Sequence, residues 1–430
     1  MKEFFALTRF RMKTTIKGID GGVIIPAGIA APFLLRRDVN KKYPHLRRRL
    51  LDPQIYLGEI NAKLCTQACT NLLSYGWFGG YPIDQYDSRQ TTQQEWKQKA
   101  LKDVINKWKG KHPADEEEIA SDIETCLNNQ VVYDCEKIIL PAPMINEARD
   151  ISTALTWIDI GLSIAKRMRL ETPLLATLAI SDNCLRGFDP WSNSILDTLL
   201  DQATSRDIHG IYLVPEQASE ENYYYTHPNT VGSILRLIEG LKAGGLNHVH
   251  VAYAGVTGLL ALTVGADTWS SGWYRGERRL RLADFERKDG RAVPAYYSHS
   301  LAAEIHLDSD LDNIVEANLL PRVADETPLS AHLLKALASG KKASSVADWQ
   351  YRPSNVTSAA EHFISAMVRE TKKISSMSAT QRLQYGESWL EKAAQLAQDI
   401  SQIGDFHART SLNHQHTWLQ AYRGFLKSTK

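Results

Sequence analysis

Residues 248–272, HVHVAYAGVTGLLALTVGADTWSSG, carry the pattern that decides the predicted fold. A short β-rich segment at 248–255 is followed by an apolar helical stretch at 256–265 and by a second strand candidate at 266–272. A strand, a crossover helix and another strand form a βαβ unit, which predicts parallel pairing.

The same alternation recurs along most of the chain. The strand candidates are residues 50–60, 136–145, 172–182, 208–216, 248–255 and 266–272, with 292–301 as a seventh and 304–307 as an eighth. They are nearly continuous apolar runs, as expected when helices cover the sheet. We predict an α/β fold, a (β/α)8 TIM-type barrel. An open doubly wound sheet is the alternative, although no GxGxxG or GxxxxGK[ST] motif follows any strand candidate.

The regions outside these units define the expected domain organisation. We expect an N-terminal arm at 1–49, the barrel at 50–310 and a helical insertion at about 84–130. From residue 311 to 430 the pattern is that of amphipathic helices, which predicts a C-terminal helical region.

The composition is that of a soluble globular protein. The 430 residues have a formal net charge of +1, so only local patches could bind nucleic acid by charge. The apolar run at 21–35 contains two prolines and is too short to span a bilayer, so we expect no membrane association. Five cysteines in no CxxC pair, none beyond Cys184, favour reduced thiols in the cytoplasm and no zinc site. We expect no cofactor.

The first strand candidate offers polar groups on one face. Asp52, Gln54 and Tyr56 alternate and therefore share a side of the strand. An inward carboxyl group would be desolvated, its pKa would rise, and it would suit a general acid or base. Alternatively, Asp52 caps the strand or pairs with an arginine of 46–50.

Two later strands end in further candidates. Glu216 follows the strand at 208–216 and is a candidate catalytic carboxylate, next to a long tyrosine-rich loop at 217–228. The tyrosines at 223–225 would either stack on a planar ligand or close the barrel mouth. Asp182 is predicted to cap a helix.

The histidines at 248 and 250 share one face of their strand. They form a candidate metal pair, but no third ligand has a recognisable spacing, so we favour a structural role and predict no metal. Tyr253 and Gly255 come at the end of this strand where ligands bind, and are candidate ligand-binding residues.

The stretch at 264–282 contains the densest group of candidates. Asp267 is a candidate catalytic residue, and the candidate ligand-binding residues are Ser270, Ser271, Trp273 and Tyr274. Four arginines follow as candidate phosphate or nucleic-acid contacts: Arg275, Arg278, Arg279 and Arg281. Alternatively, the tryptophans pack and the arginines pair with Asp284 and Glu286 on the surface.

Two basic segments flank the predicted barrel, at 36–50 and 275–291. If they converge in space, they would form a phosphate-binding rim. If they do not, each is an ordinary solvated surface.

The order of elements resembles the tRNA-guanine transglycosylase superfamily, including its DNA-modifying relatives. The segment LLDPQIYL resembles the place of that family's acid or base, which implies this role for Asp52. The segment GADTWSS resembles the family's GxDxFD motif: Asp267 matches the first aspartate, while Ser270 stands at the position of the nucleophile. The closing helices at 358–370 and 382–396 are also similar. The family's zinc-binding cysteines are absent from the C-terminal region.

Two functions follow as hypotheses. The chain is either a transglycosylase-like enzyme that acts on a nucleobase or deazaguanine-type ligand, or a decayed barrel that binds a protein or nucleic-acid partner. A barrel enzyme acting on another phosphorylated metabolite is the third alternative. The predicted partners are a nucleobase-like molecule or nucleic acid, a protein held by the C-terminal helices, or a second copy of the chain. A barrel mouth that is empty and plugged would favour the binding protein.

Overall fold

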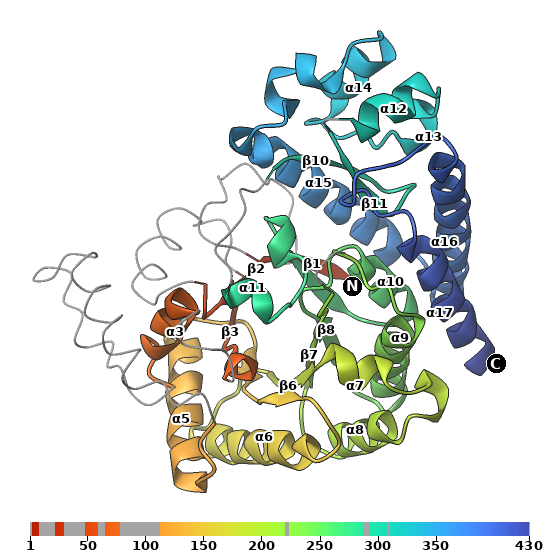
Figure 1. Cartoon of the computed structure of the whole chain (residues 1–430). Coiled ribbons are helices and arrows are strands. Elements are labelled where there is room, and N and C mark those ends of the chain that lie inside the picture. The colour runs from red at the N-terminus through yellow and green to blue at the C-terminus, as the bar shows by residue number, and fades with distance from the viewer. Residues whose placement is uncertain are drawn as a thin grey trace, which may run out of the picture.

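The computed structural model describes residues 2–7, 22–29, 48–58, 65–77, 112–219, 223–286, 293–307 and 309–429. Eight parallel strands form a nearly closed barrel in chain order (Figure 1). They are β1 (Glu3–Leu7), β2 (Gly22–Pro26), β3 (Arg49–Asp52), β4 (Ile138–Leu140), β6 (Leu174–Ile180), β7 (Gly210–Pro215), β8 (His248–Val251) and β9 (Thr268–Gly272). A two-residue strand, β5 (Met144–Ile145), also pairs with β6. The prediction of a TIM-type barrel is therefore confirmed at the level of the strands.

The barrel closes through its first strand. β9 pairs in parallel with β1, and Phe5 lies opposite Ser270. At the other seam, the Glu136 N–H donates to the Arg49 carbonyl over 3.0 Å, which joins the start of β4 to β3.

The expected N-terminal arm is wrong for the described residues between 1 and 49. Residues 3–7 and 22–26 are the first two barrel strands, so the predicted first strand is the third. The prolines at 26 and 32 suggested a broken segment, but Pro26 is the last residue of β2, a position where its missing N–H interrupts no further pairing.

The last two strand candidates are also wrong as barrel strands. β10 (Ala295–Ser298) and β11 (Ala303–His306) pair only with each other, in an antiparallel hairpin. A four-residue connection, residues 299–302, brings the chain back at once, whereas parallel pairing needs a long crossover.

Helices cover the outside of the barrel (Figure 1). Those that follow barrel strands, in chain order, are α3 (Thr66–Leu73), α5 (Glu116–Val132), α6 (Asp150–Arg167), α7 (Asp182–Arg186), α8 (Ser194–Thr204), α9 (Pro228–Ala243) and α10 (Thr257–Val264). The short helix α11 (Ala283–Glu286) lies over one end of the barrel instead (Figure 1). The prediction of a helical insertion at 84–130 is wrong for residues 116–130. They belong to α5, which packs on β4 and α6 as a barrel helix. Residues 84–111 lie outside the described residues.

The C-terminal region consists of helices, and the last three of them pack on the barrel wall. They are α12 (Asp310–Glu316), α13 (Leu320–Val323), α14 (Ala331–Ala338), α15 (Val356–Ser375), α16 (Ala379–Ser401) and α17 (His414–Ser428). α15 packs against β1, and α17 packs against α9. α15 thus takes the place of the helix that normally follows the last barrel strand.

Trp269 fixes this arrangement from β9. Its ring is fully buried, and its indole N–H donates to Thr371 Oγ1 of α15 over 3.0 Å. A Cβ on Gly258 would lie 1.9 Å from the Trp269 ring, so only glycine lets α10 approach this closely. The expectation that Trp269 packs is confirmed.

No helix among the described segments is long and apolar enough to cross a membrane.

Candidate functional site

A buried carboxyl group stands at the carboxyl end of the barrel. Asp52, the last residue of β3, has no exposed surface. Its Oδ2 accepts hydrogen bonds from the hydroxyls of Tyr56 (2.6 Å), Tyr212 (3.0 Å) and Tyr253 (3.0 Å), and its Oδ1 accepts one from the Gln54 N–H (3.1 Å). We call Asp52 and the three tyrosines the aspartate cage.

Burial dominates the titration of the cage. It raises the pKa of Asp52 to about 6, although the hydrogen bonds from Tyr56, Tyr253, Gln54 and Tyr212 oppose the shift. Burial, followed by the nearby Asp52 charge, raises the pKa values of the three tyrosines, so their hydroxyls remain donors at neutral pH. A carboxyl group that titrates near neutrality is suited to proton transfer.

Two residues of the cage region have left-handed backbones. Gln54 and Tyr253 both have φ of 53°, which is uncommon for residues with side chains. The Gln54 Nε2 donates to the Tyr253 hydroxyl over 2.7 Å, so the two strained residues hold each other. Strain of this kind clusters at functional sites. Asp52, Gln54 and Tyr56 were predicted to share one face of a strand. The strand ends at Asp52 instead, and Tyr56 lies in a 3-10 helix, η2 (Ile55–Leu57).

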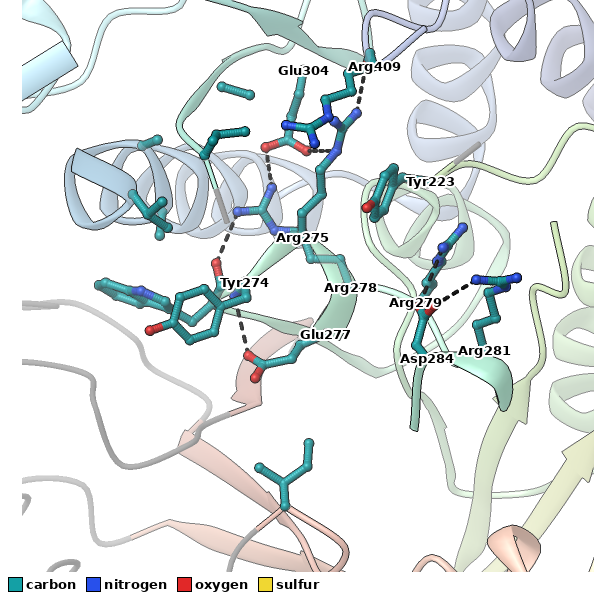
Figure 2. A pocket seen from close by; sticks show the side chains of 18 of the residues that line it. Tyr223, Tyr274, Arg275, Glu277, Arg278, Arg279, Arg281, Asp284, Glu304 and Arg409 are labelled. Atoms are coloured by element: carbon teal, nitrogen blue, oxygen red, sulfur yellow. Dashed lines mark hydrogen bonds and ion pairs between the residues drawn. The ribbon is translucent and has the colours of Figure 1, made fainter. Parts of the chain in front are cut away.

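A cleft of about 680 Å³, part of whose lining is drawn in Figure 2, reaches Gly28, whose N–H donates to Gln54 beside the cage. Its wall includes Gly28 of the β2 end, Asn71 of α3, the segment 273–279, Asp284, Glu304 of β11 and Arg409. None of the four cage residues lines the cleft, and all are at most 2% exposed. The Asp52 carboxyl group is therefore not exposed to the cleft in this structure.

Glu304 organises one side of the cleft. Its carboxylate pairs with Arg278 Nη1 (2.5 Å) and with Arg275 Nε (3.0 Å). Burial acts to raise the pKa of Glu304, but Arg278 and Arg275 outweigh it and hold that pKa below its usual value. Arg278 also lies 3.5 Å over the Phe363 ring and donates to the Gly272 and Trp273 carbonyls, so it is a structural residue rather than a ligand contact.

Tyr223 separates two of the predicted phosphate contacts. The guanidinium groups of Arg275 and Arg279 lie 4.2 and 4.4 Å from the centre of its ring (Figure 2). Such contacts between a cation and an aromatic face fix the position of both groups. Of the three consecutive tyrosines, only Tyr223 lines the cleft, since Tyr224 and Tyr225 are buried.

The far side of the cleft holds a second ion-pair group. Arg281 Nη1 lies 2.8 Å and Arg279 Nη2 lies 3.4 Å from the Asp284 carboxylate. Burial lowers the pKa of Arg279. The expected pairing with Asp284 is thus present, and it holds the arginines at the cleft instead of on an open surface.

Arg409 completes the cleft from the C-terminal region. Its guanidinium donates to the Tyr351 hydroxyl over 3.3 Å and has no carboxylate partner among the described residues. Its carbonyl accepts from Arg275 Nη2 over 2.6 Å, which ties this loop to the barrel (Figure 2). Arg275, Arg278, Arg279, Arg281 and Arg409 face three carboxylates, Glu277, Asp284 and Glu304, so the described lining carries two excess positive charges.

The predicted aromatic residues lie at different depths in the cleft wall. Tyr274 is half-buried, whereas Trp273 is 4% exposed and packs as the alternative interpretation expected. Gly255, with φ of 52°, approaches the Arg278 carbonyl and supports the cleft from behind. Arg48, Arg49 and Leu50 are the only described residues of the basic segment 36–50, and none of them lines the cleft.

The histidine pair belongs to the barrel interior. His250 Nδ1 lies 2.7 Å from Thr268 Oγ1, and His250 Nε2 lies 3.1 Å from Ser270 Oγ. Thr268 Oγ1 also lies 2.8 Å from His248 Nε2. Burial holds the pKa of His250 well below its usual value, so the ring is neutral. No group of three or more histidine, cysteine or acidic residues in the described ranges could hold a metal ion.

Ser270 and Ser271 therefore face opposite sides of β9. Ser270 points into the barrel toward His250, whereas Ser271 is buried on the other face, where its hydroxyl has no hydrogen-bond partner within the described ranges. Neither lines the cleft, so the structure does not support them as direct ligand contacts.

Asp267 is misplaced as a catalytic partner of Asp52. It precedes β9 and lies at the amino end of the barrel, where it accepts from the Val249 N–H (2.9 Å) and from Lys242 Nζ (3.0 Å). Its second oxygen lies 3.6 Å from Lys2 Nζ. Burial acts to raise the pKa of Asp267, but Lys2, the Val249 N–H and Lys242 outweigh it and lower that pKa. Asp267 therefore forms ion pairs with Lys2 and Lys242 that anchor the amino end of the barrel.

Glu216 also stands apart from the cage and the cleft. It follows β7, and its Oε2 accepts from the Asp182 N–H over 3.2 Å. Burial raises the pKa of Glu216. Ser181 caps α7 by accepting from the Cys184 N–H, so the predicted cap is one residue earlier than Asp182.

Several residues of the site were missed from sequence. Tyr212 stands in an apolar strand, where its hydroxyl was the only polar feature. Glu304 was noted only as the first residue of a possible strand, and Arg409 lies about 130 residues beyond the arginine segment.

Comparisons with models of known protein families, with curated proteins and with solved structures found no match.

Proposed function

We propose that this protein binds a phosphate-bearing ligand with a planar base, a nucleotide or a nucleic-acid strand, in the arginine-lined cleft. The observation that carries the proposal is the gathering of four guanidinium groups besides the structural Arg278 around one cleft of about 680 Å³, with Tyr223 and Tyr274 in its wall. Guanidinium groups match phosphate oxygens in geometry, and aromatic rings stack on bases.

The ion pairs within the cleft support a fixed binding surface. Glu304 and Asp284 hold four of the arginines in place, so little side-chain freedom remains to be lost when an anion binds. Arg409 is the strongest candidate for direct phosphate contact, because no described carboxylate neutralises it.

A second function, transglycosylase-like chemistry on a nucleobase, is favoured by the aspartate cage. Asp52 would act as the acid or base, as the family resemblance implies, and its pKa near 6 suits that role. Two observations weigh against it: the cage is closed, and Ser270, at the place of the family's nucleophile, is engaged by His250. Binding is therefore the better-supported function.

The binding proposal is tested by fluorescence anisotropy with a labelled single-stranded oligonucleotide and with a labelled mononucleotide. Arg409→Ala should raise the Kd by about tenfold through loss of one charged contact. Arg423→Ala is the matched control, since Arg423 is exposed on α17 and pairs with Glu387 and Glu391. Absence of binding by the wild type, or equal Kd values for Arg409→Ala and the wild type, would overturn the proposal.

The catalytic alternative has a separate test. Base exchange or base release from the same oligonucleotide would be measured for the wild type and for Asp52→Asn. Turnover by the wild type that is lost in Asp52→Asn, with binding retained, would establish the enzyme. Binding without turnover would establish the binding protein.

A further inference from the structure

Gln54 joins the wall of the cleft to the buried carboxyl group. Its Oε1 accepts from the Gly28 N–H over 2.5 Å, and its Nε2 donates to the Tyr253 hydroxyl over 2.7 Å. Tyr253 in turn donates to Asp52. Gly28 lines the cleft, so a single side chain separates a cleft-lining peptide from the aspartate cage.

The surroundings of Gln54 are built for this contact. A Cβ on Gly28 would lie 2.8 Å from the Gln54 Oε1, so a larger residue at position 28 would push the amide away. The Gly28 carbonyl accepts from Asn71 Nδ2 over 2.9 Å, which holds the peptide in place from α3. Gln54 itself stays in a left-handed conformation, with φ of 53° and ψ of 32°.

A left-handed non-glycine residue persists only where its neighbours hold it. The two side-chain hydrogen bonds of Gln54 are the ties that reach across to β2 and β8. If they break, the residue can relax to a common backbone conformation, and the amide leaves the space between the cleft and the cage.

We propose that the Gln54 side chain is a displaceable plug that controls access from the arginine-lined cleft to the Asp52 carboxyl group. A ligand group that accepts the Gly28 N–H would replace the Gln54 Oε1 and release the plug. The ligand-driven part of this proposal rests on the proposed binding function; the plug itself does not.

The test is chemical labelling of carboxyl groups with a water-soluble carbodiimide and a small amine, read by mass spectrometry at Asp52. Without ligand, the wild type should label at Asp52 far less than at the exposed Glu147. Gln54→Ala should label Asp52 about tenfold faster or more, because two hydrogen bonds that close the site are lost.

Gln130→Ala is the matched control for general loosening. Gln130 is equally buried, and its side chain makes two hydrogen bonds with the backbone N–H and carbonyl of Ile139, whereas those of Gln54 go to the Gly28 N–H and the Tyr253 hydroxyl. It should leave Asp52 labelling unchanged. Equal labelling in Gln54→Ala and the wild type, or equal labelling in the two variants, would overturn the plug.

The ligand arm uses the wild type with the single-stranded oligonucleotide, and binding is followed by anisotropy in the same samples. Increased Asp52 labelling on binding supports displacement of the plug by ligand. Binding with unchanged labelling overturns that displacement. If the oligonucleotide does not bind, the proposed function fails, and the ligand-free comparison alone decides the plug.

Discussion

Asp52 and Asp267 lie at opposite ends of the barrel. Asp52 is the last residue of β3, Asp267 directly precedes β9, and the two strands belong to one parallel sheet. A pair of carboxylates separated by the length of a strand cannot act on one ligand. The chemistry at the carboxyl end must therefore rest on Asp52, the tyrosines and the arginines.

Asp267→Asn should destabilise the protein without changing ligand binding. The substitution removes the charge that pairs with Lys2 and Lys242, and we expect a loss of about 1–2 kcal/mol in the free energy of unfolding. Because the native state holds the pKa of Asp267 low, this contribution is present at neutral pH and disappears as the pH falls through that pKa. Urea titrations at pH 7 and pH 3 would check it. An altered oligonucleotide Kd in this variant would contradict the assignment.

Ionisation of Asp52 should lower the free energy of unfolding as the pH rises, whereas ionisation of Asp267 raises it. The native pKa of about 6 lies above the usual aspartate value of 3.8, so the native state binds the proton more tightly than the unfolded chain does. The stability that Asp52 contributes is present below about pH 4 and falls by about 3 kcal/mol as the pH rises through 6. Asp52→Asn should remove this fall. A wild-type-like fall between pH 4 and 6 in the variant would show that other groups cause it.

Ser270 and Ser271 form a matched pair for testing the barrel interior. Ser270→Ala leaves the buried His250 Nε2 without its partner and should cost about 1–3 kcal/mol of stability. Ser271→Ala removes a buried hydroxyl that no described residue satisfies, so it should be neutral or stabilising. Chemical denaturation of both variants measures the difference. A larger loss of stability in Ser271→Ala than in Ser270→Ala would contradict the side-chain orientation assigned to β9.

The sequence predicted the barrel from strand and helix alternation, because strands covered on both faces are recognisable as short apolar runs. It failed at β1 and β2, since the helix expected between consecutive strands was not apparent there and the prolines suggested an arm. It also predicted Asp52 and the arginine segment at 275–281 as site residues. The contacts of Tyr212 and Tyr253 with Asp52, and of Arg409 with Arg275, join residues more than 100 positions apart, which strand periodicity does not encode. The pairing of Glu304 with Arg278 spans 26 positions, but it depends on a hairpin that was predicted as barrel strands.

The salt dependence of oligonucleotide binding tests the central claim most directly. If arginines of the cleft neutralise phosphates, log Kobs should fall linearly with log salt concentration, by about 0.7 for each phosphate contacted on a single strand. The double variant Arg281→Ala and Arg409→Ala should show a slope shallower by about 1.4, whereas Arg423→Ala should keep the wild-type slope. A flat wild-type slope, or an unchanged slope in the double variant, would contradict a phosphate-binding cleft.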